Sequence, residues 1–207
     1  MDMHTYHIQS YCIIRERSIH MDGVTVLKTE ALTTLNDFLK SAYRQLGIDY
    51  PKFYKMDALC KAVFIAVELM ARKAGPIKPD TALIFSNYSS SHLSDEKHAM
   101  DLFSADNPMA SPATFVYTLP NIAMGEISIR HKLHSENVFF IFDSYLPEFL
   151  VPYNDSVLDN QKTENIISGW AEVGEQGCDL FLYLIGKSGK TPHTVAYLKT
   201  LYHNEHE

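Results

Sequence analysis

Asp143 and Ser144 are adjacent side chains of the types that acyl hydrolysis uses, and they complete the segment VFFIFDS. A serine hydroxyl becomes a nucleophile when a neighbouring base accepts its proton, so Ser144 is a candidate for a hydrolase or an acyltransferase. Aspartate and serine after a strand also form turns readily, because their side chains hydrogen-bond to nearby backbone groups. The turn is the favoured interpretation, and a catalytic Ser144 is the alternative.

Three further groups of residues have the composition of a site. His131 and His134 lie near an expected helix end, but no third ligand follows at a useful spacing, so we expect no metal. The run Ser89–Ser91 before His92 either contacts a ligand or caps a helix. The segment GKSGK, residues 186–190, lacks the spacing of a phosphate-binding loop, and we expect a hairpin turn there. None of these groups indicates a bound cofactor.

The three cysteines, Cys12, Cys60 and Cys178, lie in apolar runs far apart in the sequence. An odd number of widely spaced cysteines is typical of reduced, buried thiols rather than of disulfides or a zinc site. The first residues show no signal-peptide pattern, and no apolar run approaches the length of a membrane span. We therefore expect a cytoplasmic protein.

The composition argues against nucleic acid as a partner and favours a single folded domain. The formal net charge of the 207 residues is -7 at pH 7. Nucleic-acid binding requires an excess of positive charge, so nucleic acid is not an expected partner. With 46% hydrophobic residues and no linker or internal repeat, the chain is expected to form a single domain over residues 1–207.

Hydrophobic periodicity predicts alternating strands and helices, which is typical of an α/β fold. The helix over residues 57–74 is apolar around nearly its whole circumference, and such a helix is usually buried between layers. The expected strands are 7–15, 81–86, 138–142, 179–185 and 194–202, and the other expected helices are 30–46, one capped by Ser94, 120–133 and 156–173.

Four segments resemble the N-terminal half of β-ketoacyl synthases, which have the thiolase-like fold. They are YPKFYKMDALCKAVFIAVELM, ALIFSN, SPATFVYTLPNIAMGEISIRHKLHSEN and VFFIFDS, and the match runs from Tyr50 to Ile185. The strongest element, LPNIAMGEISIRHKL, is similar to the family pattern P-N-x-x-x-G-x-I-S-I-x-x-x-L. The resemblance implies a thiolase-like half domain with a mixed sheet, covering helices and 57–74 as its most buried helix.

The same resemblance places Ser144 at, or within one residue of, the family's nucleophilic cysteine. In the family that cysteine starts a helix, where the positive helix end favours a thiolate and backbone N–H groups stabilise the oxyanion. None of the three cysteines lies near this position, and Pro147 and Pro152 are expected to interrupt a helix that begins at Ser144. The family's two catalytic histidines lie in its C-terminal half, which we expect this chain to lack.

The leading hypothesis is therefore a non-catalytic subunit, similar to shortened, chain-length-factor-like relatives of ketosynthases. It would pair with an active β-ketoacyl synthase in fatty acid or polyketide-type biosynthesis, with aryl polyene or flexirubin pigments among the candidate products. It would meet acyl carrier protein through that partner. The alternatives are a serine-dependent acyl hydrolase or acyltransferase that uses Ser144, and a homo-oligomer that binds an acyl ligand.

The apolar strand over residues 138–142 has two possible roles. An apolar strand by default fills a core in a sheet that is covered on both faces. The resemblance instead implies a position on a twofold axis, where the strand pairs antiparallel with a second copy or with a ketosynthase. The candidate interface residues are Val138, Phe139, Phe140, Ile141 and Phe142.

Overall fold

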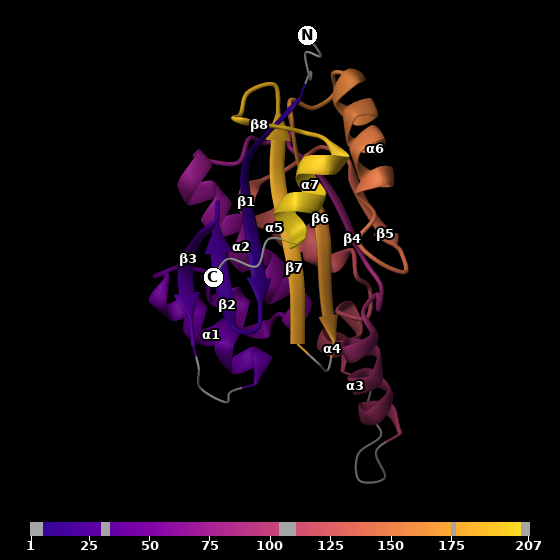
Figure 1. The fold of residues 1–207 in the computed structure, drawn as a ribbon. Coiled ribbons are helices and arrows are strands. Elements are labelled where there is room, and N and C mark those ends of the chain that lie inside the picture. Colours follow the sequence, from indigo (N-terminus) through magenta and orange to yellow (C-terminus); the bar gives the residue numbers. More distant parts are fainter. Residues whose placement is uncertain (1–5, 30–33, 104–110, 175–176, 204–207) are drawn as a thin grey trace.

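A mixed sheet runs through the molecule, with β7 (Gly177–Gly186) at its centre (Figure 1). The computed structural model describes residues 6–29, 34–103, 111–174 and 177–203. The strand order is β3-β2-β1-β7-β6-β4-β5, and β8 (Thr191–Pro192) pairs with the start of β1. The other strands are β1 (His7–Arg15), β2 (Ser18–Met21), β3 (Val24–Lys28), β4 (Ala82–Asn87), β5 (Asn137–Ile141) and β6 (Asn165–Gly174).

Strand direction divides the sheet into two parts. The pairs from β3 to β6 are antiparallel, whereas β4 pairs parallel with both β6 and β5. Parallel strands require crossover connections, and helices provide them here. The segment between β4 and β5 contains α3 (His92–Leu102), α4 (Pro112–Val116) and α5 (Ile122–His131), and α6 (Pro147–Asp159) connects β5 to β6.

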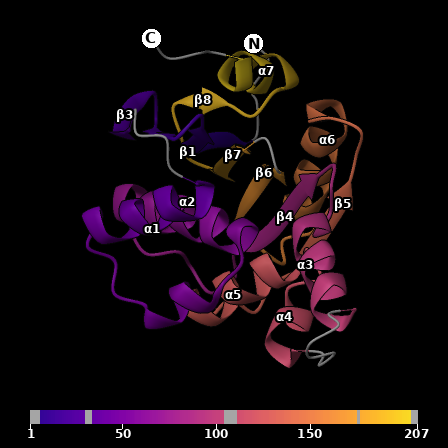
Figure 2. The ribbon, with the colours of Figure 1, turned by 90° about the horizontal axis from the view of Figure 1, so that it is seen from below.

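Helices cover both faces of the sheet (Figure 2). On one face, α2 (Ala58–Ala74) packs against the strands, with α1 (Leu35–Gln45) and α5 beside it. Every residue of α2 from Leu59 to Met70 is buried, which confirms the expected buried helix. A second core lies under α6 and α7 (Val195–His203) on the opposite face and includes Trp170 and Tyr183.

Two elements near the C-terminus differ from their predicted type. Residues 156–173, expected as a helix, contain the end of α6 and most of β6. Strand β6 is buried on both faces, so its sequence NIISGWAEV shows no alternation that distinguishes a strand from a buried helix. Residues 194–202, expected as a strand, form helix α7, where Leu198 is the fully buried position and Leu201 and Tyr202 pack against the same core.

Other boundaries shift by a few residues. Helix α3 begins at His92, after the N-cap Ser91, rather than at Ser94. Helix α1 begins at Leu35 with Thr34 as its N-cap, and residues 30–33 of the expected helix lie outside the described residues. Strand β5 is only half-buried, because it lies at the edge of the sheet, although its side chains contact the cores on both faces. No helix in the described ranges has the length and apolar character to cross a bilayer.

Candidate functional site

Ser144 lies in the loop between β5 and α6, and its side chain is exposed. Helix α6 begins at Pro147, which suits the first helical position, and it continues through Pro152. As expected, no helix begins at Ser144, and Pro147 marks the helix start, but the expectation that Pro152 interrupts a helix is wrong. In the described part of the chain, no histidine or carboxylate hydrogen-bonds to the Ser144 hydroxyl. The structure assembles no nucleophile and base at this position.

Strand β5 lies at one edge of the sheet and pairs only with β4 among the described strands. Its side chains alternate between the two faces: Phe139 packs against the core around α2, and Phe140 packs against the core under α6. The Phe140 ring stacks on Phe142 at a centroid distance of 5.4 Å, and both rings contact Phe149 of α6. The predicted interface strand is therefore an edge strand with an aromatic cluster beside it.

His131 and the GKSGK segment, which the sequence did not favour as metal or phosphate sites, lie in other surroundings in the fold. The His131 Nε2 atom lies 3.2 Å from Glu68 Oε1, and no cluster of three potential metal ligands is present among the described residues. The GKSGK segment follows β7, but the short strand β8 that comes next pairs with β1 rather than with β7. The expected hairpin is therefore absent, and the segment opens no helix that could bind a phosphate.

The serine run Ser89–Ser91 is occupied by hydrogen bonds within the fold. The Ser89 hydroxyl donates to Glu172 of β6, whose carboxylate also accepts from the Tyr88 N–H at 2.7 Å. The Ser91 hydroxyl donates to the Thr118 carbonyl at 2.5 Å. These bonds tie the loop after β4 to its neighbours. Ser91 occupies the N-cap position of α3 but its hydroxyl makes no capping hydrogen bond, so the loop interpretation describes the run and the capping hydroxyl does not.

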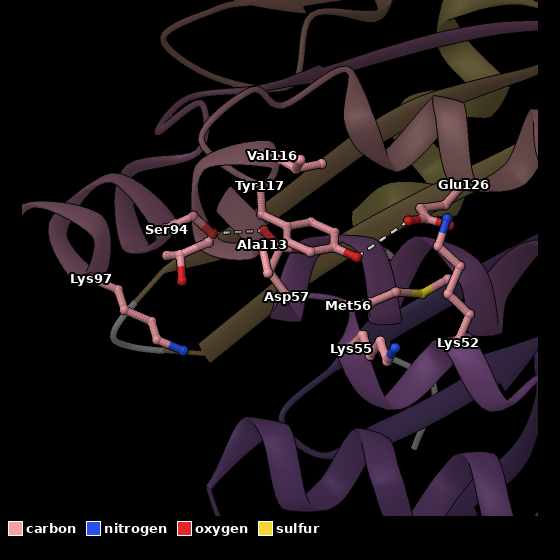
Figure 3. A pocket seen from close by; sticks show the side chains of 11 residues that line it. Lys52, Lys55, Met56, Asp57, Ser94, Lys97, Ala113, Val116, Tyr117 and Glu126 are labelled. Carbon is pink, nitrogen blue, oxygen red and sulfur yellow. Dashed lines mark hydrogen bonds and ion pairs between the residues drawn. The ribbon is translucent and has the colours of Figure 1, made fainter. Parts of the chain in front are cut away.

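A cavity that the sequence did not reveal lies between η1 (Pro51–Lys55), the start of α2, and helices α3, α4 and α5 (Figure 3). Its volume is about 530 Å³, within the range of small-molecule sites. The inner wall is formed by buried or half-buried side chains, and the outer rim by exposed ones. The lining residues are Lys52, Lys55, Met56, Asp57, Ser94, Lys97, Ala113, Thr114, Val116, Tyr117 and Glu126.

Glu126 of α5 is the central polar group of this cavity. It is 3% exposed, and its Oε2 atom lies 2.8 Å from the Lys52 ammonium. The Tyr117 hydroxyl points at the same carboxylate and donates to Oε1 over 3.3 Å (Figure 3). Burial and the charge of Glu126 raise the pKa of the Tyr117 phenol, so it remains a neutral donor. Close contact with Glu126 raises the pKa of Lys52, so that side chain remains a cation.

Asp57 forms the second polar corner of the cavity. Its Oδ1 atom accepts from the Cys60 N–H at 2.8 Å, which caps α2, and its Oδ2 atom accepts from the Ser94 hydroxyl at 2.8 Å. Both oxygens therefore have partners within the protein. Burial, together with Asp57, raises the pKa of the Cys60 thiol well above its usual value, which disfavours the reactive thiolate.

Comparisons with known proteins identify the fold. Neither a protein-family model nor a curated protein matches the chain. A solved structure named the ishigamide ketosynthase/chain length factor matches with a TM-score of 0.58 and 12% identity, over 88% of this chain and 62% of that chain. The ketosynthase ApeO in complex with its chain length factor ApeC, from Xenorhabdus doucetiae, matches with a TM-score of 0.61 and 12% identity, over 96% of this chain and 90% of that chain.

The chain has the fold of ketosynthase and chain length factor structures. The expected thiolase-like α/β architecture, with a mixed sheet, a buried helix and covering helices, is confirmed. The chain spans 62% of the length of the ishigamide chain that it matches.

One feature of the sequence could have indicated the buried polar group of the cavity. Glu126 is a charged residue in the otherwise apolar segment NIAMGEISI, and Ala123 and Ile127 on either side of it are core positions. A charge at such a position is rarely buried without a partner. Its partners Lys52 and Tyr117 come from two other segments, and sequence spacing alone does not bring those segments together.

Proposed function

We propose that this chain is a non-catalytic ketosynthase-like subunit that pairs with an active β-ketoacyl synthase through β5. The observation that carries the proposal is the open edge of this strand. An edge strand presents unpaired backbone groups, and proteins usually cover such an edge or protect it with charges. Strand β5, with the sequence NVFFI, has no charged residue and contains no proline.

The hydrogen bonds between β4 and β5 show which backbone groups of β5 remain available to pair with another chain. The N–H of Phe142 donates to the Asn87 carbonyl of β4 at 2.9 Å. Successive N–H groups of a strand point to opposite sides, so the N–H groups of Phe139 and Ile141 point away from β4. These groups are placed to pair with a strand of another chain, in the antiparallel arrangement that a twofold axis produces.

Exposed apolar side chains continue this edge. Ile141 of β5 is 52% exposed and Ile129 of α5 is 64% exposed. Phe149, which contacts both rings of the aromatic cluster, and Leu146 are also exposed. Large apolar side chains that remain exposed in this way favour a protein–protein interface.

The comparisons support a ketosynthase as the partner. The Xenorhabdus complex contains a ketosynthase together with its chain length factor, and the present chain covers 90% of the chain that it matches there. By analogy, the pair would act in polyketide-type or fatty acid biosynthesis, with aryl polyene or flexirubin pigments as candidate products. Acyl carrier protein would be met through the partner. The exposed Ser144 without a base supports a subunit that does no chemistry of its own.

The test is co-expression with a β-ketoacyl synthase encoded beside this chain in its genome, followed by size-exclusion chromatography with light scattering. The wild-type chain should form a complex of one copy of each protein. Ile141→Asp should weaken that complex at least about tenfold, because it places an uncompensated charge in the interface. Val24→Asp is the matched control, since Val24 is exposed on β3, at the opposite edge of the sheet.

Two outcomes would contradict the proposal. In one, Ile141→Asp retains wild-type affinity, so that β5 lies outside the interface. In the other, Val24→Asp weakens the complex as much as Ile141→Asp does. A homodimer that is unaffected by the synthase would favour self-association through the same edge over the heterodimer.

A further inference from the structure

The cavity beside Glu126 has the features of a ligand site, and this argument is independent of the proposed pairing. All of its lining residues come from this chain, so no partner is needed to form it. Its inner end is polar, its walls are largely apolar, and two lysines stand at its outer rim. Each of these three parts restricts the chemistry of an occupant.

The inner end offers an acceptor. The side chain of Glu126 is only 4% exposed, yet its Oε2 atom has no hydrogen-bond partner within the described structure. The Lys52 ammonium at 2.8 Å forms an ion pair with this oxygen and neutralises its charge, and a second lone pair of the oxygen remains open to another donor. A carboxylate oxygen can accept more than one hydrogen bond, and leaving a buried acceptor unpaired is costly. An O–H group of a ligand would supply the missing donor.

The rim offers cations. Lys55 and Lys97 are exposed, and neither forms an ion pair with another described residue. Met56 and Val116 also line the cavity and provide apolar contact. Each oxygen of Asp57 already accepts a hydrogen bond from the protein, whereas Glu126 Oε2 accepts none among the described residues, so Glu126 is the stronger candidate to receive a ligand donor.

We propose that this cavity binds an apolar chain that carries a hydroxyl group at its inner end and a carboxylate at its outer end. The hydroxyl donates to Glu126 Oε2, the chain lies against Met56 and Val116, and the carboxylate lies near Lys97, which stands apart from Glu126 in Figure 3. Glu126 is then the residue that determines specificity, since it distinguishes a hydroxyl-ended chain from a plain one.

The test is calorimetric titration of the purified full chain with three matched probes: 10-hydroxydecanoate, decanoate and 1,10-decanediol. We expect 10-hydroxydecanoate to bind about tenfold more tightly than either of the others, since each of those lacks one polar contact. Glu126→Gln should reduce the preference for the hydroxyl, because a hydrogen bond to a neutral acceptor is weaker. Lys97→Glu should weaken both carboxylates and leave the diol unchanged.

Two further variants make the test specific. Val116→Trp should abolish binding of all three probes by filling the cavity, and a surface substitution at this exposed position should leave the fold intact. Lys162→Glu makes the same charge change as Lys97→Glu at an exposed residue outside the cavity and should change nothing. Equal affinity for decanoate and 10-hydroxydecanoate, or unchanged binding by Val116→Trp, would overturn the proposal. Either result would leave the proposed complex through β5 standing, because that proposal does not depend on the cavity.

Discussion

At the scale of single residues, Glu68 of α2 shows how a buried carboxylate is kept ionised. Its two oxygens accept from Arg130 Nε at 2.9 Å and from Arg130 Nη2 at 3.1 Å, and His131 lies beside them. Burial opposes ionisation, but the contacts with His131 and Arg130 outweigh it and lower the pKa of Glu68 to about 2. The pair joins α2 to α5, and α5 also contributes Glu126 to the cavity.

This shift predicts a pH dependence of stability. Because the folded state binds the Glu68 proton less readily than the unfolded state, acid favours unfolding through this group. The contribution is complete above the ordinary pKa of 4.5 and is lost as pH falls toward about 2. In urea unfolding, Glu68→Gln should be less stable than wild type at pH 6, and the difference should shrink below pH ~4.

A matched substitution at an exposed ion pair provides the control for this experiment. Glu164 pairs with Lys78 at 2.7 Å, but both side chains are more than half exposed, so Glu164→Gln should change stability little at any pH. A difference between wild type and Glu68→Gln that stays constant from pH 6 to pH 3 would show that the Glu68 charge does not stabilise the fold.

At the scale of elements, strand β6 depends on one glycine. Gly169 has a φ of +142°, and a Cβ atom there would lie 2.0 Å from the Phe181 carbonyl oxygen of β7. Gly169→Ala would therefore force the central strands apart, and it should lower the free energy of unfolding by about 3 kcal/mol or more.

Gly174, at the end of the same strand, is the comparison for this substitution. A Cβ atom there would meet only Glu172 Oε1 at 3.9 Å, which is an ordinary contact. Gly174→Ala should therefore be nearly neutral in the same urea unfolding measurement. Similar losses for the two variants would show that the close approach of β6 and β7 does not limit stability.

Some elements of the fold could be predicted from the sequence and others could not, and the difference has a physical reason. Helix α2 was predictable because its apolar residues cover the whole circumference over more residues than a strand usually has. Strand β6 was not, because burial on both faces removes the alternation by which a strand is recognised. The edge position of β5 was implied by family resemblance, whereas the cavity needs five elements together and none of their sequences specifies that arrangement.

At the scale of the whole molecule, the two cores share one sheet and should unfold together. Trp170 on β6 is the only tryptophan of the chain and lies in the core under α6 and α7. Helices α1, α2 and α5 dominate the other core. If residues 1–207 form a single domain, Trp170 fluorescence and far-ultraviolet circular dichroism should give the same urea midpoint. Separate midpoints would show that the two faces unfold independently.

The position of β7 also has a consequence for folding during synthesis. Strand β7 lies between β1 and β6, so His7 near the start of the chain pairs with Gly186 near its end. Until the ribosome has released residue 186, β1 and β6 each lack a neighbour, and the nascent chain holds two incomplete sheets with open apolar edges. Such long-range pairing is slow and exposes the chain to aggregation. Association through β5 would then be an event that follows release, and chaperones would protect the chain until that point.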